Sequence, residues 1–563
     1  MCARMPFSKH LCQERDGMRL MRRERSFEGV HTSSAIAMAV MERSGIRALI
    51  DERVRFDDKR KLSPGNAVKA MIGPIFDAKR KLPLSGIRHY YRGAPVDLLF
   101  GDGVTEESLN DKALARNLDS IFESGMEELF WDCSSMIRRK YGFDSHIKHM
   151  DSTNYTVYAL PPDDVGDGAA VPAFGGNAKD GRNDLLQYNA ATITDGDRII
   201  EYCKAYSGNV SDTVMDSETI DFLKGHVDPE QDTVIADCKL VNTSLITKLN
   251  GMGMGFVSKV PAIFSQKVQA DLVRSAMTGV MDDLGDGYSV YETESDTVCG
   301  ELRFIAYRSP KGTRRAMDYL RRQGLKDAQK RFRDVCRMDF NCERDATDCL
   351  MMALKAHRKS AYDAKYSIVG HEKTLRRPTP GRPRKDESPP ETVVKWKVVV
   401  DLEFNEERAR ELAEEHDISV IVTNLPFSTE DAPNIRQGAT TETVLRLYLD
   451  QYKVEHTYRL MKSGMGVDSV YVRTPSRANA LLFVVAIATL VSSVIDALLK
   501  RSGRSRFATV KQASQAVMNS SFEICRETDE AQVTGAEGSV DLVFDYLDGI
   551  GLDPSVLFDR YDG

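Results

Sequence analysis

The chain has 563 residues, enough for several domains and a large core. Charged residues make up 29% and hydrophobic residues 42% of it, which excludes a disordered or fibrous protein and is typical of a globular one. The net charge of −7 gives no overall sign of a nucleic-acid-binding protein, although local basic patches can still bind nucleic acid.

Residues 1–145 are predicted to be mostly helical. Breaks are expected at residues 62–65, 81–86 and 100–103. Residues 105–142 have the pattern of two consecutive helices, with Thr105 as an N-cap. The first 26 residues contain no apolar segment of the kind a secretory signal needs, so we expect a cytoplasmic protein.

From residue 146 onward the pattern changes to strands. Residues 146–160 alternate and are rich in β-branched and aromatic side chains. Two more strands are expected at residues 185–195 and 198–209, joined by a hairpin turn at residues 195–197. A helix (216–226), a strand (233–238), a helix (242–251) and a strand (255–260) follow. Three antiparallel strands and then helix–strand–helix–strand predict an α/β fold with a mixed sheet.

The next segment, residues 262–425, is expected to be rich in strands. The strands are predicted at residues 288–293, 300–308, 395–404 and 418–425. A basic linker at residues 370–390 is too rich in proline and charge to form a packed core. The nearest approach to a metal cluster is formed by Cys336, Cys342, Cys349 and His357. Their spacing matches no zinc motif and the chain has no Cys-x-x-Cys pair, so free structural thiols in a reducing compartment are expected.

Residues 448–464, YLDQYKVEHTYRLMKSG, are predicted to form one helix with a polar stripe. At about 100° per residue, its members fall within an arc of roughly 60°. They are Tyr448, Gln451, Glu455 and Lys462. Taken alone, this stripe also fits an ordinary solvent-exposed helix face.

An apolar segment at residues 478–500 is nearly long enough to span a bilayer. It contains Ser492, Ser493 and Asp496, and carboxylates inside a membrane are costly. We therefore predict a buried core helix and no membrane association. Residues 501–563 are expected to form a C-terminal tail.

Two aspartates occupy unusual positions. Asp151 lies inside the first predicted strand, and Asp237 lies at the end of a later apolar strand. A carboxylate in a hydrophobic strand is costly unless it is paired, hydrogen-bonded or bound to a cation. Asp237 could equally be a capping or turn residue. Together with Glu455, the two would supply three oxygen ligands suited to Mg²⁺.

These features belong to several ordered blocks that resemble one family. The blocks are LNDKALARNLDSIF (residues 109–122), residues 177–213 with a Gly-Asn-x-x-Asp segment, VIADCKLV (234–241), FVSKVP (256–261), VIVTNL (420–425) and YLDQYKVEHTYRLMKS (448–463). The sequence resembles the DDE transposases of bacterial and archaeal insertion sequences, the group with a Tyr-x2-Arg-x3-Glu-x6-Lys signature. Gln451 stands where that signature has Arg, and a neutral amide supplies no charge to a phosphate.

The resemblance implies a ribonuclease-H-like catalytic domain formed by residues 146–261 and 426–500. Residues 262–425 would be a β-rich insertion, and residues 1–145 would bind the DNA ends. The metal-binding triad would be Asp151, Asp237 and Glu455, holding two Mg²⁺ ions, with Mn²⁺ as a possible substitute. The DNA-contacting residues would be Tyr448, Gln451, Lys462, Lys179 and Arg182, although a structural ion-pair role fits Lys179 and Arg182 equally well.

Local basic footprints lie in the expected insertion. Residues 303–333 hold eleven Lys and Arg but only two Asp. In the linker, Arg382 and Arg384 belong to an Arg-Pro element that could enter an A·T minor groove, although a merely solvated linker is equally consistent with the sequence.

The function implied is DNA transposition, a form of DNA recombination. The enzyme would bind the terminal inverted repeats of a transposable element as a homodimer on double-stranded DNA, associated with the nucleoid. It would cut there with metal and join the released 3′-OH to target DNA. The alternatives are a ribonuclease-H-fold nuclease that cuts without joining, and a catalytically inactive DNA-binding derivative.

Overall fold

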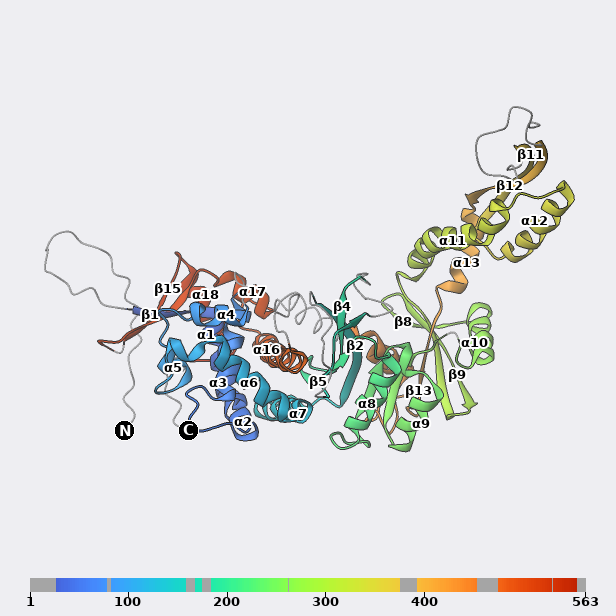
Figure 1. The fold of residues 1–563 in the computed structure, drawn as a ribbon. Helices are drawn as coiled ribbons and strands as arrows, with labels where there is room; N and C mark the ends of the chain where they lie inside the picture. The colour runs from blue at the N-terminus through green and yellow to red at the C-terminus, as the bar shows by residue number, and fades with distance from the viewer. Residues whose placement is uncertain are drawn as a thin grey trace, which may run out of the picture. The chain divides into compact units, whose positions relative to one another are not determined.

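A computed structural model of the chain describes its main chain at residues 27–77, 83–157, 168–174, 184–261, 263–374, 392–452, 474–528 and 530–553. Within these ranges the fold is mixed α/β (Figure 1), as the sequence predicts. The chain divides into two compact units. The first comprises Met1–Ser258, Asp431–Gly438 and Arg446–Gly563, and the second comprises Lys259–Glu430 and Ala439–Leu445.

The N-terminal part of the first unit is a group of helices, as predicted. They are α1 (Thr32–Ser44), α2 (Ile46–Arg53), α3 (Pro64–Phe76), α4 (Leu84–Tyr90), α5 (Val96–Phe100), the 3₁₀ helix η1 (Glu106–Leu109), α6 (Asp111–Glu123) and α7 (Met126–Tyr141). Thr105 is an N-cap, as predicted, and forms a capping box with Ser108, but it begins only the short helix η1. The first longer helix of the predicted pair, α6, begins at Asp111 with Asn110 as its N-cap.

The core of this unit forms around one long apolar helix, α16 (Pro475–Ser502). It contacts α1, α3, α6 and α7 (Figure 1), and 83% of its most apolar 18-residue window is buried in the protein. By length and composition alone it could cross a membrane. Its buried Asp496 accepts a hydrogen bond at 2.5 Å from the Val510 main-chain N–H, in the first turn of α17 (Val510–Ala516). The predicted buried core helix is therefore confirmed.

The central strands of the first unit run in the order β3–β4–β2–β6–β7, with β5 pairing β4. They are β2 (Ile147–Val157), β3 (Ala173–Phe174), β4 (Leu186–Asp195), β5 (Ile200–Ser207), β6 (Thr233–Ala236) and β7 (Gly255–Lys259). The first long strands, β2, β4 and β5, are antiparallel, and β6 and β7 run parallel to β2. Helices α8 (Asp212–Leu223) and α9 (Thr243–Gly251) connect the parallel strands. Each predicted strand in this region is confirmed.

The two ends of the described chain meet in a small antiparallel sheet. Strand β14 (Ser521–Cys525) lies between β1 (Phe27–His31) and β15 (Glu530–Thr534). Helix α18 (Ser539–Gly549) follows and contacts α16 and α17. The segment predicted as a tail therefore contributes strands and helices to the first unit.

The second unit combines strands with helices. Strands β8 (Asp282–Gly285), β9 (Tyr288–Thr297), β10 (Gly300–Arg308) and β13 (Ser419–Thr423) pair antiparallel, and β11 (Tyr362–Thr374) pairs with β12 (Thr392–Phe404). Its helices are α10 (Gln266–Thr278), α11 (Gly312–Arg337), α12 (Glu343–His357) and α13 (Glu406–His416). The unit overlaps the range expected for a β-rich insertion, but in its described residues the helices α10 to α13 accompany the strands.

Candidate active site

Asp151 and Asp237 lie at the same level of two neighbouring parallel strands. Asp151 belongs to β2, and Asp237 directly follows β6. The register pairs Met150 with Ala236, so the two aspartates are the next residues along each strand. Because neighbouring strands are about 4.8 Å apart, this register brings the two predicted carboxylates together in the sheet.

Each of these carboxylates also has a local hydrogen bond. Asp151 Oδ1 accepts from the Ser152 N–H at 2.7 Å. Asp237 is the N-cap of the 3₁₀ helix η2 (Cys238–Leu240), and its Oδ1 accepts from the Lys239 N–H at 2.8 Å. The capping interpretation of Asp237 is thus confirmed in its geometry. A carboxylate that caps through one oxygen still has lone pairs for a further ligand.

The structure adds Asp212, Asp216 and Lys239, which the sequence reasoning did not single out. Ser152 Oγ donates to Asp212 Oδ1 at 2.7 Å, and Lys239 forms an ion pair with Asp212. Helix α8 begins at Asp212, four residues earlier than predicted, so Asp212 and Asp216 are one turn apart on the same helix face. The signal for Asp212 was present, since it ends the Gly-Asn-x-x-Asp segment.

The charges of this cluster do not balance. Burial and the carboxylates of Asp212, Asp151 and Asp237 together raise the pKa of Asp216 to about 7, although Lys239 opposes the rise. Although burial alone would lower the pKa of Lys239, that pKa is raised by the ion pair with Asp212 and by the other two carboxylates. Four carboxylates around one ammonium group form a site whose negative charge a cation would relieve.

The donor chemistry of the cluster suits a hard divalent cation. Carboxylate oxygens are the ligands that Mg²⁺ and Mn²⁺ prefer. Among the residues that the structure describes, no group of three or more His, Cys, Asp or Glu is already arranged to hold a metal ion. The same holds for Cys336, Cys342, Cys349 and His357, the nearest approach to a metal cluster in the sequence. His357 Nε2 lies 2.6 Å from the Tyr362 carbonyl oxygen, and Cys342 caps α12. The predicted third ligand, Glu455, lies outside the described residues.

The helix predicted to carry the polar stripe begins as expected but is interrupted after Leu449. Tyr448 lies in the last turn of α14 (Thr441–Leu449), and a turn follows at residues 450–451, so the prediction of one unbroken helix is wrong there. The Gln451 N–H donates to the Tyr448 carbonyl oxygen at 3.1 Å. In such an i→i−3 turn, residues three apart lie one above the other, so Tyr448 and Gln451 still share a side.

The other five predicted DNA contacts all lie outside the described part of the chain. These are Lys462, Lys179, Arg182, Arg382 and Arg384. Within the predicted basic stretch, Arg303 is not available to DNA. It is buried, it pairs with Glu292 at 2.5 Å, and its Nη1 donates to three main-chain carbonyl groups. Arg308 ends β10 and is half-buried, whereas most other cations of that stretch are exposed along α11, among them Arg314, Arg322 and Lys330.

A comparison with known protein families finds a match in the N-terminal helices. Residues 33–135 match a family described as a domain of unknown function (DUF4277), a range that runs from α1 into α7. No curated protein matches the chain. The matched residues are less than half of the chain, and the carboxylate cluster lies outside them. The match therefore says nothing about what the cluster does.

Proposed function

We propose that the chain is a DDE transposase whose first unit contains a ribonuclease-H-like catalytic domain. The observation that carries the proposal is the placement of Asp151 and Asp237 at one level of the parallel strands β2 and β6. The strand arrangement supports it, because three antiparallel strands followed by two parallel ones are what such a domain requires. The family resemblance adds Glu455 as the third carboxylate.

The roles of the chain's residues follow from their charge. Asp151, Asp237 and Glu455 would hold two Mg²⁺ or Mn²⁺ ions, and such a pair activates an attacking oxygen and stabilises the leaving one. Asp212 holds Lys239 beside the cluster through their ion pair. Without a bound cation the pKa of Asp216 is about 7, and divalent ions held by the neighbouring carboxylates would lower it.

The proposed reaction exchanges phosphodiester bonds without oxidation or reduction. In the first step, a water oxygen attacks the phosphorus at the element end, and the bond from phosphorus to the 3′ oxygen breaks. The 3′ oxygen leaves as a hydroxyl after taking a proton, and the phosphate remains on the 5′ side. In the second step, this 3′-OH attacks a target phosphorus and displaces its 3′ oxygen, so one phosphodiester replaces another and no covalent protein intermediate forms.

The proposed partner is double-stranded DNA. A homodimer would bind both the terminal inverted repeats of the element and the target DNA. Beside the active site, Tyr448, Gln451 and Lys462 would contact the backbone, together with Lys179 and Arg182. Arg382 and Arg384 would reach DNA from the linker. A neutral amide at Gln451 can donate a hydrogen bond to a phosphate, but without the strength of a charged bidentate donor.

The proposal is tested by exchanging each carboxylate for its amide. Asp151→Asn, Asp237→Asn and Glu455→Gln nearly conserve volume and each removes one negative charge. We expect each change to lower Mg²⁺-dependent cleavage of labelled end DNA by about a hundredfold or more, because members of one catalytic unit act together. The triple variant should be hardly worse than a single one.

The same samples are assayed for DNA binding by mobility shift, which should be retained or tightened as repulsion from phosphate falls. Asp197→Asn, at an exposed turn of the same sheet, serves as the matched control and should cut normally. Wild-type-level cutting by one of the three variants would remove that residue from the triad. Cleavage without joining to a target plasmid would instead favour a nuclease, and binding without cleavage by the wild type an inactive derivative.

A further inference from the structure

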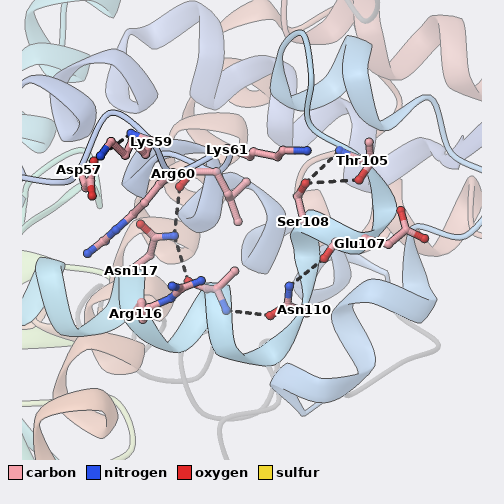
Figure 2. A pocket seen from close by; sticks show the side chains of 12 residues that line it. Asp57, Lys59, Arg60, Lys61, Thr105, Glu107, Ser108, Asn110, Arg116 and Asn117 are labelled. Carbon is pink, nitrogen blue, oxygen red and sulfur yellow. Dashed lines mark hydrogen bonds between the residues drawn. The ribbon is translucent and has the colours of Figure 1, made fainter.

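A cavity of about 560 Å³ lies among the N-terminal helices of the first unit, away from the carboxylate cluster in sequence (Figure 2). It is formed by the loop between α2 and α3, by η1, and by the first turns of α6. Ten of its twelve lining residues are polar or charged, and only Leu62 and Ala113 are apolar. Sites for small organic ligands are mostly apolar, so this lining favours a highly charged ligand.

The charges in the cavity are mainly positive. Four cations line it, namely Lys59, Arg60, Lys61 and Arg116, against two carboxylates. Among the described residues, Lys59, Lys61 and Arg116 are exposed and form no ion pair with a side chain. One of the two carboxylates, Glu107, is already paired with Arg88 at 3.2 Å. The cavity therefore offers positive charge that the protein itself does not neutralise.

The start of α6 adds to this polarity. Asn110 caps the helix by accepting from the Ala113 N–H at 3.0 Å, and both residues line the cavity. The N-terminal end of a 13-residue helix carries a partial positive charge and attracts anions.

A buried acceptor in the cavity wall also lacks a partner. Asn117 is 1% exposed, and its Nδ2 donates to the carbonyl oxygens of Leu62 at 3.3 Å and Ala113 at 3.1 Å. Its Oδ1 has no hydrogen-bond partner among the described residues. A water between this oxygen and a bound phosphate would satisfy both, since water bridges are nearly as favourable as direct hydrogen bonds.

We infer that this cavity binds phosphate groups of the DNA backbone. The choice of DNA rests on the proposed function, whereas the positive charge and the unpartnered Asn117 Oδ1 are features of the structure alone. The cations with exposed side chains come from two separate elements, so a ligand that extends along the surface can contact them together. The N-terminal region would use this site to bind the element's ends, and this binding would not involve the catalytic carboxylates.

The test uses the full chain with Lys59→Ala, Lys61→Ala and Arg116→Ala combined, and anisotropy of a labelled end duplex over a potassium chloride series. Each lost phosphate contact lowers the slope of log affinity against log salt by about 1, so the slope should fall by roughly 3. Affinity at low salt should fall by about tenfold or more. The single charge reversal Lys61→Glu, at an exposed position, should weaken binding in the same direction.

The matched control removes three exposed cations that do not line the cavity, Lys112→Ala, Arg139→Ala and Lys224→Ala. Equal slopes for the cavity variant and the wild type, or an equal loss in the control, would overturn the inference. If tripolyphosphate raises the Tm of the wild type but not of the cavity variant, and DNA binding is unchanged, the site takes a small polyphosphate instead of DNA.

These outcomes are separable from those of the proposed function. Normal cutting by Asp151→Asn would overturn the active-site assignment and leave the salt slopes as they are. A wild-type chain that binds no DNA at all would overturn both.

Discussion

Asp195, at the end of β4, is a buried carboxylate that the proposed chemistry does not use. Its Oδ1 accepts from the Ile199 N–H at 2.8 Å, and its Oδ2 has no hydrogen-bond partner among the described residues. Burial, and then the charge of Glu201, raise the pKa of Asp195 to about 7. Glu201 is itself fully buried and is held by Lys148 at 2.9 Å and Arg138 at 2.7 Å.

This raised pKa predicts a stability that falls with pH. The folded protein keeps the Asp195 proton up to about pH 7, whereas an unfolded chain releases it near pH 4. The contribution to the free energy of unfolding is therefore complete below about pH 4 and is lost as the pH rises to 7. Asp195→Asn resembles the protonated form, so we expect it to be about 2 kcal/mol more stable than the wild type at pH 8, because one pKa unit corresponds to about 1.4 kcal/mol and the pair with Glu201 shares the effect.

The measurement is urea unfolding of both proteins between pH 5 and pH 8. Asp144→Asn, at an exposed position before β2, is the control and should follow the wild-type pH dependence. Parallel pH curves for wild type and Asp195→Asn would show that Asp195 is ionised in the folded state.

At the scale of single elements, α16 carries a buried carboxylate, Asp496, inside an apolar core. Asp496 accepts from the Val510 N–H and so satisfies a donor in the first turn of α17. Asp496→Leu would raise the hydropathy of α16 and leave that buried N–H without an acceptor. We expect a loss of about 1–3 kcal/mol in the free energy of unfolding, measured by denaturant titration.

Asp496→Asn is the matched variant, since its amide oxygen can still accept from Val510. It should lose clearly less stability than Asp496→Leu. A more stable leucine variant, or one that partitions into detergent micelles, would show that the apolar character of α16 serves a purpose other than core packing.

The elements most predictable from the sequence were those with strong local periodicity. Strands β2, β4, β5, β6 and β7 were expected because alternating or apolar residues fill them, and Asn242 marked the start of α9. The start of α8 at Asp212 was missed because its first turn, DTVM, has no helical apolar period. The proximity of Asp216 to Asp151 could not be predicted for a different reason: it arises from tertiary packing and not from spacing in the chain.

At the scale of the whole chain, the largest difference from expectation concerns the C-terminal residues. Strand pairing between β1 and β14 leaves no local mark in the sequence, because each strand is five residues long and its partner is hundreds of residues away. Phe522 in β14 is 1% exposed and belongs to the same core as α16. A residue predicted to lie in a tail is thus part of the main core.

This placement predicts a large effect of Phe522→Ala. Removing a buried aromatic side chain costs about 3–5 kcal/mol, so the Tm of the transition that reports the first unit should fall clearly. The measurement is differential scanning calorimetry. Arg504→Ala, at an exposed position in the same C-terminal segment, is the control and should leave the Tm unchanged. If Phe522→Ala also left the Tm unchanged, β14 would not contribute to the stability of the core.

The pairing of β1 with β14 also sets an order of events during synthesis. Thr32 and Ser520, which are hydrogen-bonded beside these strands, are 488 residues apart in the chain. At about 5–20 residues per second, the ribosome makes β14 roughly 25 to 100 seconds after β1. The N-terminal helices must therefore wait with an incomplete core, while the second unit, encoded in between, has all its strands before translation ends. A nascent chain of this protein would expose apolar surface for most of its synthesis. We therefore expect ribosome-associated chaperones to bind it during that time.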